Sequence, residues 1–252
     1  MTTDIHTHLG SHRMDYDNVD TSNLSKHTET LISRMDTFGL QRAVLTPANP
    51  INGNEVTLEA AAIYPDRLFS SCMIMPRPID GARRQIRKYV DQDCKALIID
   101  ERFCYPGDPA TLALVGEAID ASIPVMYHNE IMRGDWFSFV DNASMLYPDG
   151  KFVILQMGGL FGFPQMIPLL TRDNIWMEIS VNLVKLVESH LRVFLDAVVQ
   201  DMGVSKLVFG SEHHSEYPDI MASLNLIDLN IETSRVIQQE NAWLLLGLDF
   251  SW

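Results

Sequence analysis

Short apolar runs rich in β-branched residues recur along the whole chain. There are eight of them, and each is too short to be a helix. Their starts lie roughly 25 to 40 residues apart. Runs of this kind are typical of strands buried on both faces of a parallel sheet. The predicted strands are Thr3–His6, Ala43–Thr46, Leu68–Ile74, Ala96–Ile99, Pro124–Tyr127, Phe152–Leu155, Ile175–Ile179 and Leu207–Phe209.

Segments with helical periodicity lie between these runs. Leu24–Phe38 has apolar residues on one face and ends before Gly39, a residue type that often terminates helices. Pro109 precedes another such segment and suits the first turn of a helix, where its missing N–H leaves no bond unmade. The remaining predicted helices are Ile79–Val90, Leu112–Ala121, Leu183–Gln200 and Thr233–Leu246.

The alternation of strand and helix predicts an α/β fold, the (β/α)8 TIM barrel. Eight units in 252 residues leave about 31 residues for each, so we expect one domain over residues 1–252 with no room for a lid domain. The alternative is an open, doubly wound sheet. Such a sheet usually has a glycine-rich phosphate loop after its first strand, and Asp4–Gly10 does not supply one.

Charge and cysteine content limit the partners of the chain. A formal net charge of −14 argues against nucleic acid, because binding to phosphates needs a basic face. No apolar stretch reaches the roughly 20 residues that span a bilayer, and the N-terminus does not resemble a signal peptide. Cys72, Cys94 and Cys104 form no CxxC pair, which is typical of a reducing compartment. We therefore expect a cytoplasmic protein that binds neither nucleic acid nor membranes.

Polar residues follow the ends of most predicted strands. In a barrel the chemistry occurs there, where the carboxyl ends of the strands meet the following loops. Five of the eight histidines of the chain belong to this set. Its members are Asp4, His6, His8, Asn49, Arg77, Asp100, Glu101, Arg102, His128, Glu130, Gln156, Ser180, Asn182, Glu212, His213 and His214.

Three of these histidines predict a metal site. His6 and His8 are two positions apart on a strand, so both side chains face the same side and can reach one ion. His128 follows the fifth strand and would approach from across the barrel. Imidazole is a ligand that zinc prefers in proteins. The alternative is that the histidines are structural and hydrogen-bonded within the core.

Glu212 ends the eighth strand, which neighbours the first strand in a closed barrel. Its carboxylate could bind the metal, hold the attacking water or do both; a surface carboxylate is the alternative. For His213 and His214 we expect at least one to be a solvated loop residue rather than a ligand.

Five short motifs occur in a specific order along the chain. They are Asp4-Ile5-His6-Thr7-His8, the histidine after the fifth strand, Met157-Gly158-Gly159, Phe209-Gly210-Ser211-Glu212, and a last helix with Asn241-Ala242 and Leu246-Gly247-Leu248. In this order the chain resembles the amidohydrolase superfamily from Asp4 to about Leu248. It is most similar to the amidohydrolase-related group, which includes aminocarboxymuconate semialdehyde decarboxylase and lactone hydrolases.

The resemblance implies a barrel that holds one divalent metal ion, commonly zinc. By motif position, His6, His8 and His128 match the ligands of the family, and Glu212 matches its strand-eight aspartate. Some members of the group work without a metal, so a metal-free site is the alternative. Members of the family often pair, which implies a homodimer.

Two residues depart from the family pattern. Gln156 stands where the family has a histidine, and an amide cannot exchange a proton near neutral pH, which disfavours decarboxylation by a histidine-dependent route. Glu212 is longer than aspartate by one C–C bond, about 1.5 Å, and would crowd the metal unless its loop retreats.

The expected function is metal-dependent hydrolysis of a small anionic substrate. A metal-activated water attacks a carbonyl group, Glu212 moves the proton, Gln156 steadies the oxyanion and His128 completes the catalytic set. The alternatives are a non-oxidative decarboxylase of the same group and a degenerate barrel that only binds a small ligand.

Arginines and aromatic residues near the strand ends complete the predicted site. Arg77, Arg102 and Arg133 are candidates for binding a substrate carboxylate in a bidentate manner. Trp136, Phe137 and Phe139 would cover the pocket, form a subunit interface or pack in the local core.

Overall fold

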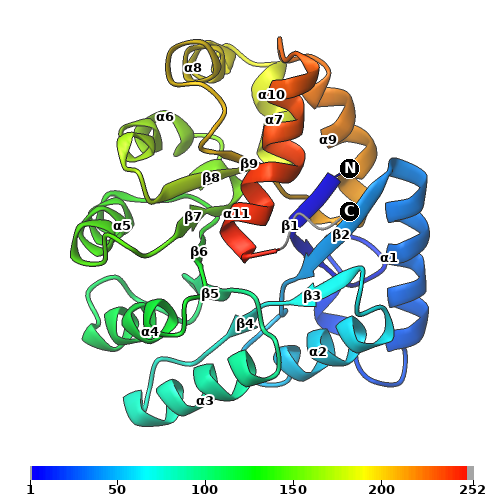
Figure 1. Cartoon of the computed structure of the whole chain (residues 1–252), viewed down its shortest axis with the longest axis vertical. Helices are drawn as coiled ribbons and strands as arrows, with labels where there is room; N and C mark the ends of the chain where they lie inside the picture. Colours follow the sequence, from blue (N-terminus) through cyan, green and yellow to red (C-terminus); the bar gives the residue numbers. More distant parts are fainter. Residues whose placement is uncertain (1, 249–252) are drawn as a thin grey trace.

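The structure is a computed structural model that describes residues 2–248, and its centre is a ring of parallel strands surrounded by helices (Figure 1). The strands are β1 (Thr2–His8), β2 (Leu40–Leu45), β3 (Leu68–Ser70), β4 (Cys72–Met73), β5 (Leu97–Asp100), β6 (Val125–His128), β7 (Phe152–Ile154), β8 (Ile175–Ile179), β9 (Leu207–Phe209) and β10 (Glu212–His213). Each of the eight predicted runs overlaps one or two of these strands, and their bounds differ by a few residues at most. The (β/α)8 barrel predicted from the sequence is therefore confirmed.

Two barrel strands are each divided into two short pieces. β3 pairs with β2 and β4 pairs with β5, and the single residue Ser71 joins β3 to β4. Its N–H donates to the carbonyl of Leu45, so the ring continues through the break. β10 is separated from β9 by Gly210 and Ser211 and pairs with β1, where Thr7 lies opposite Glu212. This last pairing closes the ring and brings Glu212 beside the first strand.

Helices follow the strands around the ring. They are α1 (Leu24–Phe38), α2 (Gly53–Ile63), α3 (Ile79–Asp91), α4 (Pro109–Asp120), α5 (Gly134–Leu146), α6 (Phe163–Met166), α7 (Val181–Val187), α8 (Arg192–Ala197), α9 (Tyr217–Leu224), α10 (Ile231–Arg235) and α11 (Asn241–Leu246). As expected, α1 ends at Gly39, whose φ of 72° is in the left-handed region that glycine adopts easily. A π-helical turn over Val236–Glu240 joins α10 to α11.

The prediction of one continuous helix over Leu183–Gln200 is wrong. The chain leaves the helical conformation after Val187 and resumes it at Arg192. Between them the Ser189 hydroxyl donates to the Leu186 carbonyl and accepts from the N–H of Leu191. A serine that bonds the nearby backbone in this way replaces helical hydrogen bonds and interrupts the helix.

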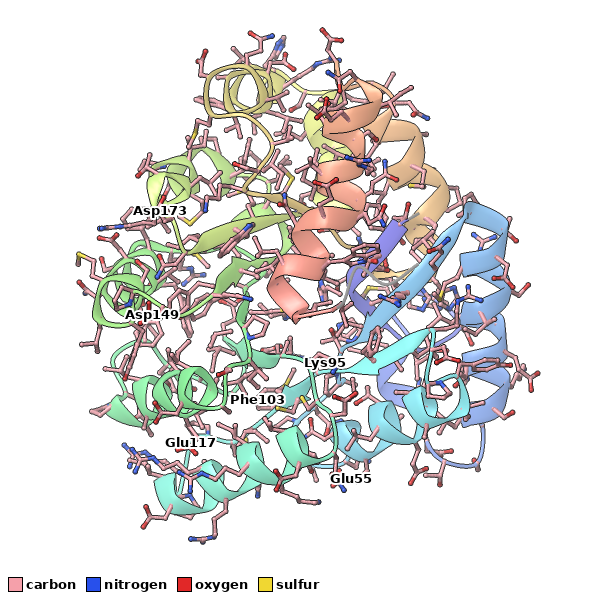
Figure 2. The ribbon with its side chains drawn as sticks, viewed as in Figure 1. Glu55, Lys95, Phe103, Glu117, Asp149 and Asp173 are labelled. Atoms are coloured by element: carbon pink, nitrogen blue, oxygen red, sulfur yellow. The ribbon has the colours of Figure 1, made fainter. Side chains whose placement is uncertain are left out.

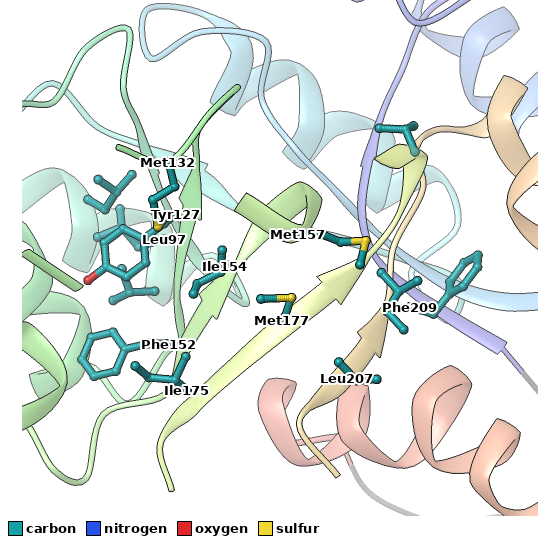
Figure 3. Packing of buried hydrophobic residues seen from close by; sticks show 14 of the residues in the cluster. Leu97, Tyr127, Met132, Phe152, Ile154, Met157, Ile175, Met177, Leu207 and Phe209 are labelled. Atoms are coloured by element: carbon teal, nitrogen blue, oxygen red, sulfur yellow. The ribbon is translucent and has the colours of Figure 1, made fainter. Parts of the chain in front are cut away.

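Alternate residues of the strands face two different hydrophobic layers. One set packs between strands and helices; Figure 3 shows Ile154, Met177 and Phe209 among its members. The other set fills the inside of the barrel and consists of Ile5, Val44, Met73, Ala96, Ile98, Met126, Val153, Leu155, Trp176 and Val208, together with residues of α11. The near-continuous apolar strand sequences follow from this burial on both faces.

Helix α11 closes one end of the barrel. In Figure 1 it lies across the ring of strands, and its residues Trp243 and Leu245 pack on the inner layer. The indole N–H of Trp243 donates to the hydroxyl of Thr3, near the start of β1. Because this end is filled, only the carboxyl ends of the strands are left to form a site.

A bulge in β1 directs the two histidines of the first motif. Between Asp4 and Thr7 the strand advances three residues while β2 advances two, from Ala43 to Leu45. Such an extra residue shifts the alternation of side chains and is common beside functional sites. Ile5 faces the barrel interior, and after the bulge His6 and His8 also face inward.

The aromatic residues predicted near the fifth strand belong to the core. Trp136 and Phe139 lie on α5, are 4% and 9% exposed, and pack against Tyr127 with ring centroids 6.3 and 6.1 Å away. Phe137 also packs on this layer. Of the three expected roles, local core packing is therefore the one that the structure shows. Among residues 2–248, no helix is both long and apolar enough to cross a membrane.

A pair of buried tyrosines provides a test of this packing. The Tyr127 hydroxyl is buried and has no hydrogen-bond partner among the described residues, whereas the Tyr217 hydroxyl donates to the Asp4 carboxylate at 3.0 Å. We expect Tyr127→Phe to leave the free energy of unfolding unchanged or raise it by about 1 kcal/mol. The matched variant Tyr217→Phe should lower it by about 1.5–3 kcal/mol, because a buried carboxylate loses a donor. Urea unfolding of both variants measures the difference, and equal losses would contradict the packing described.

Candidate metal centre

Four side chains converge at the carboxyl end of the barrel. His6 and His8 come from β1, His128 from the end of β6 and Glu212 from β10. One ligand atom of each lies within 4.8 Å of those of the other three. The Glu212 Oε2 atom is 3.7 Å from the Nε2 atoms of both His6 and His128. The structure thus brings together the four residues that the sequence suggested for a metal site.

Each imidazole is oriented by a hydrogen bond from its Nδ1 atom. These bonds join His6 to Glu178 Oε1, His8 to the Thr46 carbonyl and His128 to Asp100 Oδ2, each at 2.9 Å. A carbonyl or carboxylate can only accept, so Nδ1 carries the proton. In a neutral ring the Nε2 lone pair then faces the centre. Metal-binding histidines are commonly held in this way.

The donor atoms at the centre fit a divalent cation. The Nε2 atoms of His6 and His8 are buried and have no hydrogen-bond partner among the described residues. A buried acceptor without a partner is unfavourable by about 1–3 kcal/mol, so two of them aimed at one point indicate a missing positive charge. Three imidazoles and one carboxylate form a donor set that zinc and similar ions accept.

The charges around the centre are strongly coupled. Burial lowers the pKa of His8 to about 3, which keeps this ring neutral. Burial also lowers the pKa of His128, but its hydrogen bond to Asp100 and the nearby negative charge of Glu212 outweigh this effect and raise the pKa to about 10. Burial raises the pKa of Glu212, yet the nearby imidazoles hold it well below its usual range. The centre is therefore built to keep Glu212 ionised.

The two departures from the family pattern touch each other. The side-chain nitrogen of Gln156 donates to Glu212 Oε2 and lies 3.0 Å from His128 Nε2. Both Gln156 and Glu212 have left-handed backbones, with φ of 52° and 66°. This conformation is unusual for residues with a side chain and changes the direction in which the side chain leaves the strand end. With this backbone conformation, an oxygen of the longer Glu212 carboxylate lies within 4.8 Å of a ring nitrogen of each of the three imidazoles.

A pocket of about 570 Å³ opens over these residues. This volume is within the range of small-molecule sites. Its wall combines charged, polar and apolar side chains from several loops after the strands. The lining residues are Arg13, Met14, Tyr16, Asp100, Glu101, Arg102, His128, Glu130, Ile131, Gln156, Leu160, Phe161, Val181, Asn182, Lys185 and Glu212.

The three arginines proposed from the sequence lie in different places. Arg102 lines the pocket, where its guanidinium binds the Asp100 carboxylate and the carbonyl of Ala48. Arg77 is 65% exposed and forms an ion pair with Asp108. Arg133 is exposed at the start of α5, and neither Arg77 nor Arg133 is a lining residue.

Two cations in the pocket were not predicted. Arg13, in the loop after β1, and Lys185, on α7, both line the pocket. Neither side chain forms an ion pair or hydrogen bond with another described residue. For Arg13, the signal in the sequence was its position five residues after His8, in the loop that follows the first strand. In the sequence, Lys185 has the pattern of an ordinary solvent-exposed residue on a helix.

The expectation that His213 or His214 is solvated is wrong. Both are buried, at 0% and 3% exposure. His213 Nδ1 bonds the Ser215 hydroxyl, and His214 Nε2 donates to the carbonyl of Gly10. Neither belongs to the group that could hold a metal ion. The bond of His214 attaches the segment after Glu212 to the loop after β1.

Sequence reasoning also missed Glu178. It lies within β8, is 0% exposed and binds His6. The signal was present as a single charged residue in the otherwise apolar run Ile175–Ile179. A fully buried carboxylate is rare unless it is paired, so the pattern alone could have marked this position.

Comparison with known proteins gives similarity of structure only. No family model matches the chain, and no curated protein matches it. Among solved structures, one similar protein is described as a probable 2-pyrone-4,6-dicarboxylic acid hydrolase from Acinetobacter baumannii, with citric acid bound. It has 16% identity and a TM-score of 0.75 over 98% of this chain and 99% of that one.

Two decarboxylases are similar over the same extent. The 2,6-dihydroxybenzoate decarboxylase from Rhizobium has 14% identity and a TM-score of 0.75, over 98% of this chain and 99% of that one. The 5-carboxyvanillate decarboxylase from Novosphingobium aromaticivorans, complexed with manganese, has 14% identity and a TM-score of 0.67 over 98% and 96%. At such low identities the likeness shows that this chain shares their barrel fold along nearly its full length.

Proposed function

We propose that this protein is a metal-dependent hydrolase of the amidohydrolase superfamily that acts on a small carboxylated substrate. The observation that carries the proposal is the pair of buried, unpartnered Nε2 atoms of His6 and His8 facing Glu212. The order of the sequence motifs supports the same family, as do the neighbours described as a hydrolase and as decarboxylases.

His6, His8, His128 and Glu212 would hold the single divalent ion. Zinc is the first candidate for three imidazoles and a carboxylate. Manganese is the second, because it is bound in the decarboxylase from Novosphingobium aromaticivorans. When bound, such an ion supplies Lewis acidity, which polarises a substrate oxygen and makes water more acidic.

The residues of the chain perform the remaining steps of hydrolysis. Glu212, kept ionised by the nearby imidazoles, accepts the proton of the attacking water at the carboxylate oxygen that does not hold the ion. The amide N–H of Gln156 donates to the oxygen that gains negative charge. His128 stays fixed by its bond from Nδ1 to Asp100, so that its Nε2 lone pair would serve the ion.

Arg13 and Lys185 are proposed to bind the substrate carboxylate. Both line the pocket and lack an acidic partner, whereas Arg102 is already bonded to Asp100. An unpaired guanidinium and an ammonium group attract an anion to a chain whose net charge is −14. The roles given to Arg77, Arg102 and Arg133 from the sequence stay predictions.

Decarboxylation is the second candidate, favoured by the equal TM-scores of the hydrolase and of the Rhizobium decarboxylase. It requires a proton to replace the lost carboxylate on carbon, and Gln156 cannot supply one. Release of carbon dioxide from a carboxylated aromatic substrate would favour this alternative. Tight binding without turnover would instead favour a barrel that has lost catalysis.

A cytoplasmic location and a homodimer complete the proposal. The three cysteines are unpaired, which suits a reducing compartment. The homodimer rests on the family resemblance alone.

Elemental analysis tests the metal site. We expect protein purified without chelator to contain about one divalent ion per chain, and His6→Ala and His8→Ala to lose it, because each removes an imidazole donor. His190→Ala is the matched control, since this exposed histidine lies between α7 and α8 and outside the centre. Zinc at about 100 times its Kd should raise the unfolding free energy of the wild type by about 2.7 kcal/mol. A wild type without bound metal, whose activity is unaffected by chelation, would refute the proposal.

Charge removal at the pocket tests the substrate class. With 2-pyrone-4,6-dicarboxylic acid and 2,6-dihydroxybenzoate as first probes, Arg13→Gln and Lys185→Gln should each weaken binding by about tenfold or more, the loss of one charge-assisted hydrogen bond. Arg172→Gln is the control and should bind as the wild type does, because its guanidinium pairs with Asp141 outside the pocket. Calorimetric titration measures all three. Equal binding by every variant would contradict the assignment of Arg13 and Lys185.

A further inference from the structure

Glu178 occupies the centre of the barrel although it belongs to an apolar strand. It lies in β8 and is 0% exposed, and it is not among the residues that line the pocket. Placing a carboxylate in such a site is strongly unfavourable unless its oxygens find donors. The hydrogen-bond donors around the Glu178 carboxylate therefore indicate its role.

Each oxygen of Glu178 accepts a hydrogen bond from a different strand end. Oε1 accepts from Nδ1 of His6 at 2.9 Å, and Oε2 accepts from the backbone N–H of Gln156 at 2.5 Å. One side chain thus joins β8 to β1 and to the turn after β7. The two residues that it holds contribute different groups to the metal centre.

The Gln156 peptide is held on both sides. Its N–H is bound by Glu178, and its carbonyl accepts from the side chain of Asn182 at 2.8 Å. Gln156 and Met157 both have left-handed backbones, at φ of 52° and 59°. Two successive residues in this conformation persist only where the surrounding structure fixes them. Glu178 and Asn182 supply that restraint.

Gly210 provides the space that Glu178 needs. A Cβ atom at position 210 would overlap Oε1 of Glu178 and lie 2.7 Å from its Cδ. Gly210 is not among the residues with positive φ, so its backbone does not require glycine. The glycine of the Phe209-Gly210-Ser211-Glu212 motif is explained by the neighbouring carboxylate.

We propose that Glu178 is the positioning residue of the metal centre, because it fixes His6 and Gln156 relative to each other. A glycine is required at position 210 because the Glu178 side chain occupies the space that a Cβ atom would need. The inference rests on the proposed metal site. Glu178 acts through His6 and Gln156 and does not itself reach the pocket. Both oxygens of Glu178 must accept a hydrogen bond. A carboxylate is therefore needed at this position, and a side chain of the same size is not sufficient.

The variant Glu178→Gln removes one acceptor and leaves the volume unchanged. Its amide NH₂ group must face a donor, either His6 Nδ1 or the Gln156 N–H. We expect the affinity for Zn²⁺ to fall about 10- to 100-fold, as for other groups that orient a metal-binding histidine. Competition with a chromophoric chelator measures it, and excess Zn²⁺ should restore occupancy.

Glu117→Gln is the matched control. Glu117 is also buried, at 5% exposure, but it lies on α4 and pairs with Arg83 and Arg87 of α3. Figure 2 labels it in this outer layer, away from the ring of strands. The same change of carboxylate to amide should leave the Zn²⁺ affinity unchanged there.

A second readout separates positioning from general stability. The ¹⁵N signals of the His6 ring report which nitrogen carries the proton. In the protein without added metal, at a pH at which the ring is neutral, we expect a single tautomer protonated at Nδ1 in the wild type and a mixture in Glu178→Gln. Loss of stability alone would not change either this spectrum or the Zn²⁺ affinity of the folded protein.

A double-mutant cycle tests the contact with Gly210 in the protein without added metal. Gly210→Ala should destabilise the wild type, because the new methyl group overlaps Glu178. In a Glu178→Ala background the same change should be tolerated, because the side chain that it would strike is gone. Equal losses in both backgrounds would overturn the role given to Gly210.

The outcomes for Zn²⁺ separate this inference from the proposed function. A wild type that does not bind Zn²⁺ or Mn²⁺ overturns the proposed function and the positioning role with it. A wild type that binds and a Glu178→Gln variant that binds equally well, with an unchanged His6 spectrum, overturn only the positioning role.

Discussion

The site depends on hydrogen bonds that hold three imidazoles in place. Each ring donates a hydrogen bond from Nδ1 to a buried oxygen. The acceptors are the carboxylates of Glu178 and Asp100 and the carbonyl of Thr46. Because these acceptors come from strands and strand ends, the closed ring of parallel strands fixes their positions. The Nε2 atoms are then left to face one another around Glu212, in an arrangement that a cation would stabilise.

The closing strand explains why this end of the barrel carries the site. β10 pairs with β1 and places Glu212 opposite Thr7, while α11 fills the other end with apolar side chains. Gln156 and Glu212, each unusual for the family that the sequence resembles, form a hydrogen bond with each other. The longer carboxylate at position 212 and the amide at position 156 therefore depend on each other and are best treated as one paired difference from the family pattern. Replacing Gln156 by histidine alone would leave the longer carboxylate of Glu212 in place.

The sequence predicted the strands and the converging histidines because both depend on local patterns. Buried parallel strands are continuous apolar runs, and His6 and His8 are two residues apart on one of them. It could not predict contacts between distant elements, such as Glu178 with His6 or Gln156 with Glu212. Lys185 was missed because a cation on a helix is ordinary until the fold turns it toward a pocket. The break near Ser189 was missed because one side-chain hydrogen bond overrides the helical periodicity there.

The central claim is that His6, His8, His128 and Glu212 bind one divalent ion. The most direct measurement is anomalous X-ray diffraction at the zinc edge from crystals grown with Zn²⁺. The account predicts one strong peak at the carboxyl end of the barrel, with imidazole nitrogens about 2.0–2.1 Å and a carboxylate oxygen about 2.0–2.2 Å from it. A map without a peak among these four residues, whether or not zinc binds elsewhere on the surface, would contradict it.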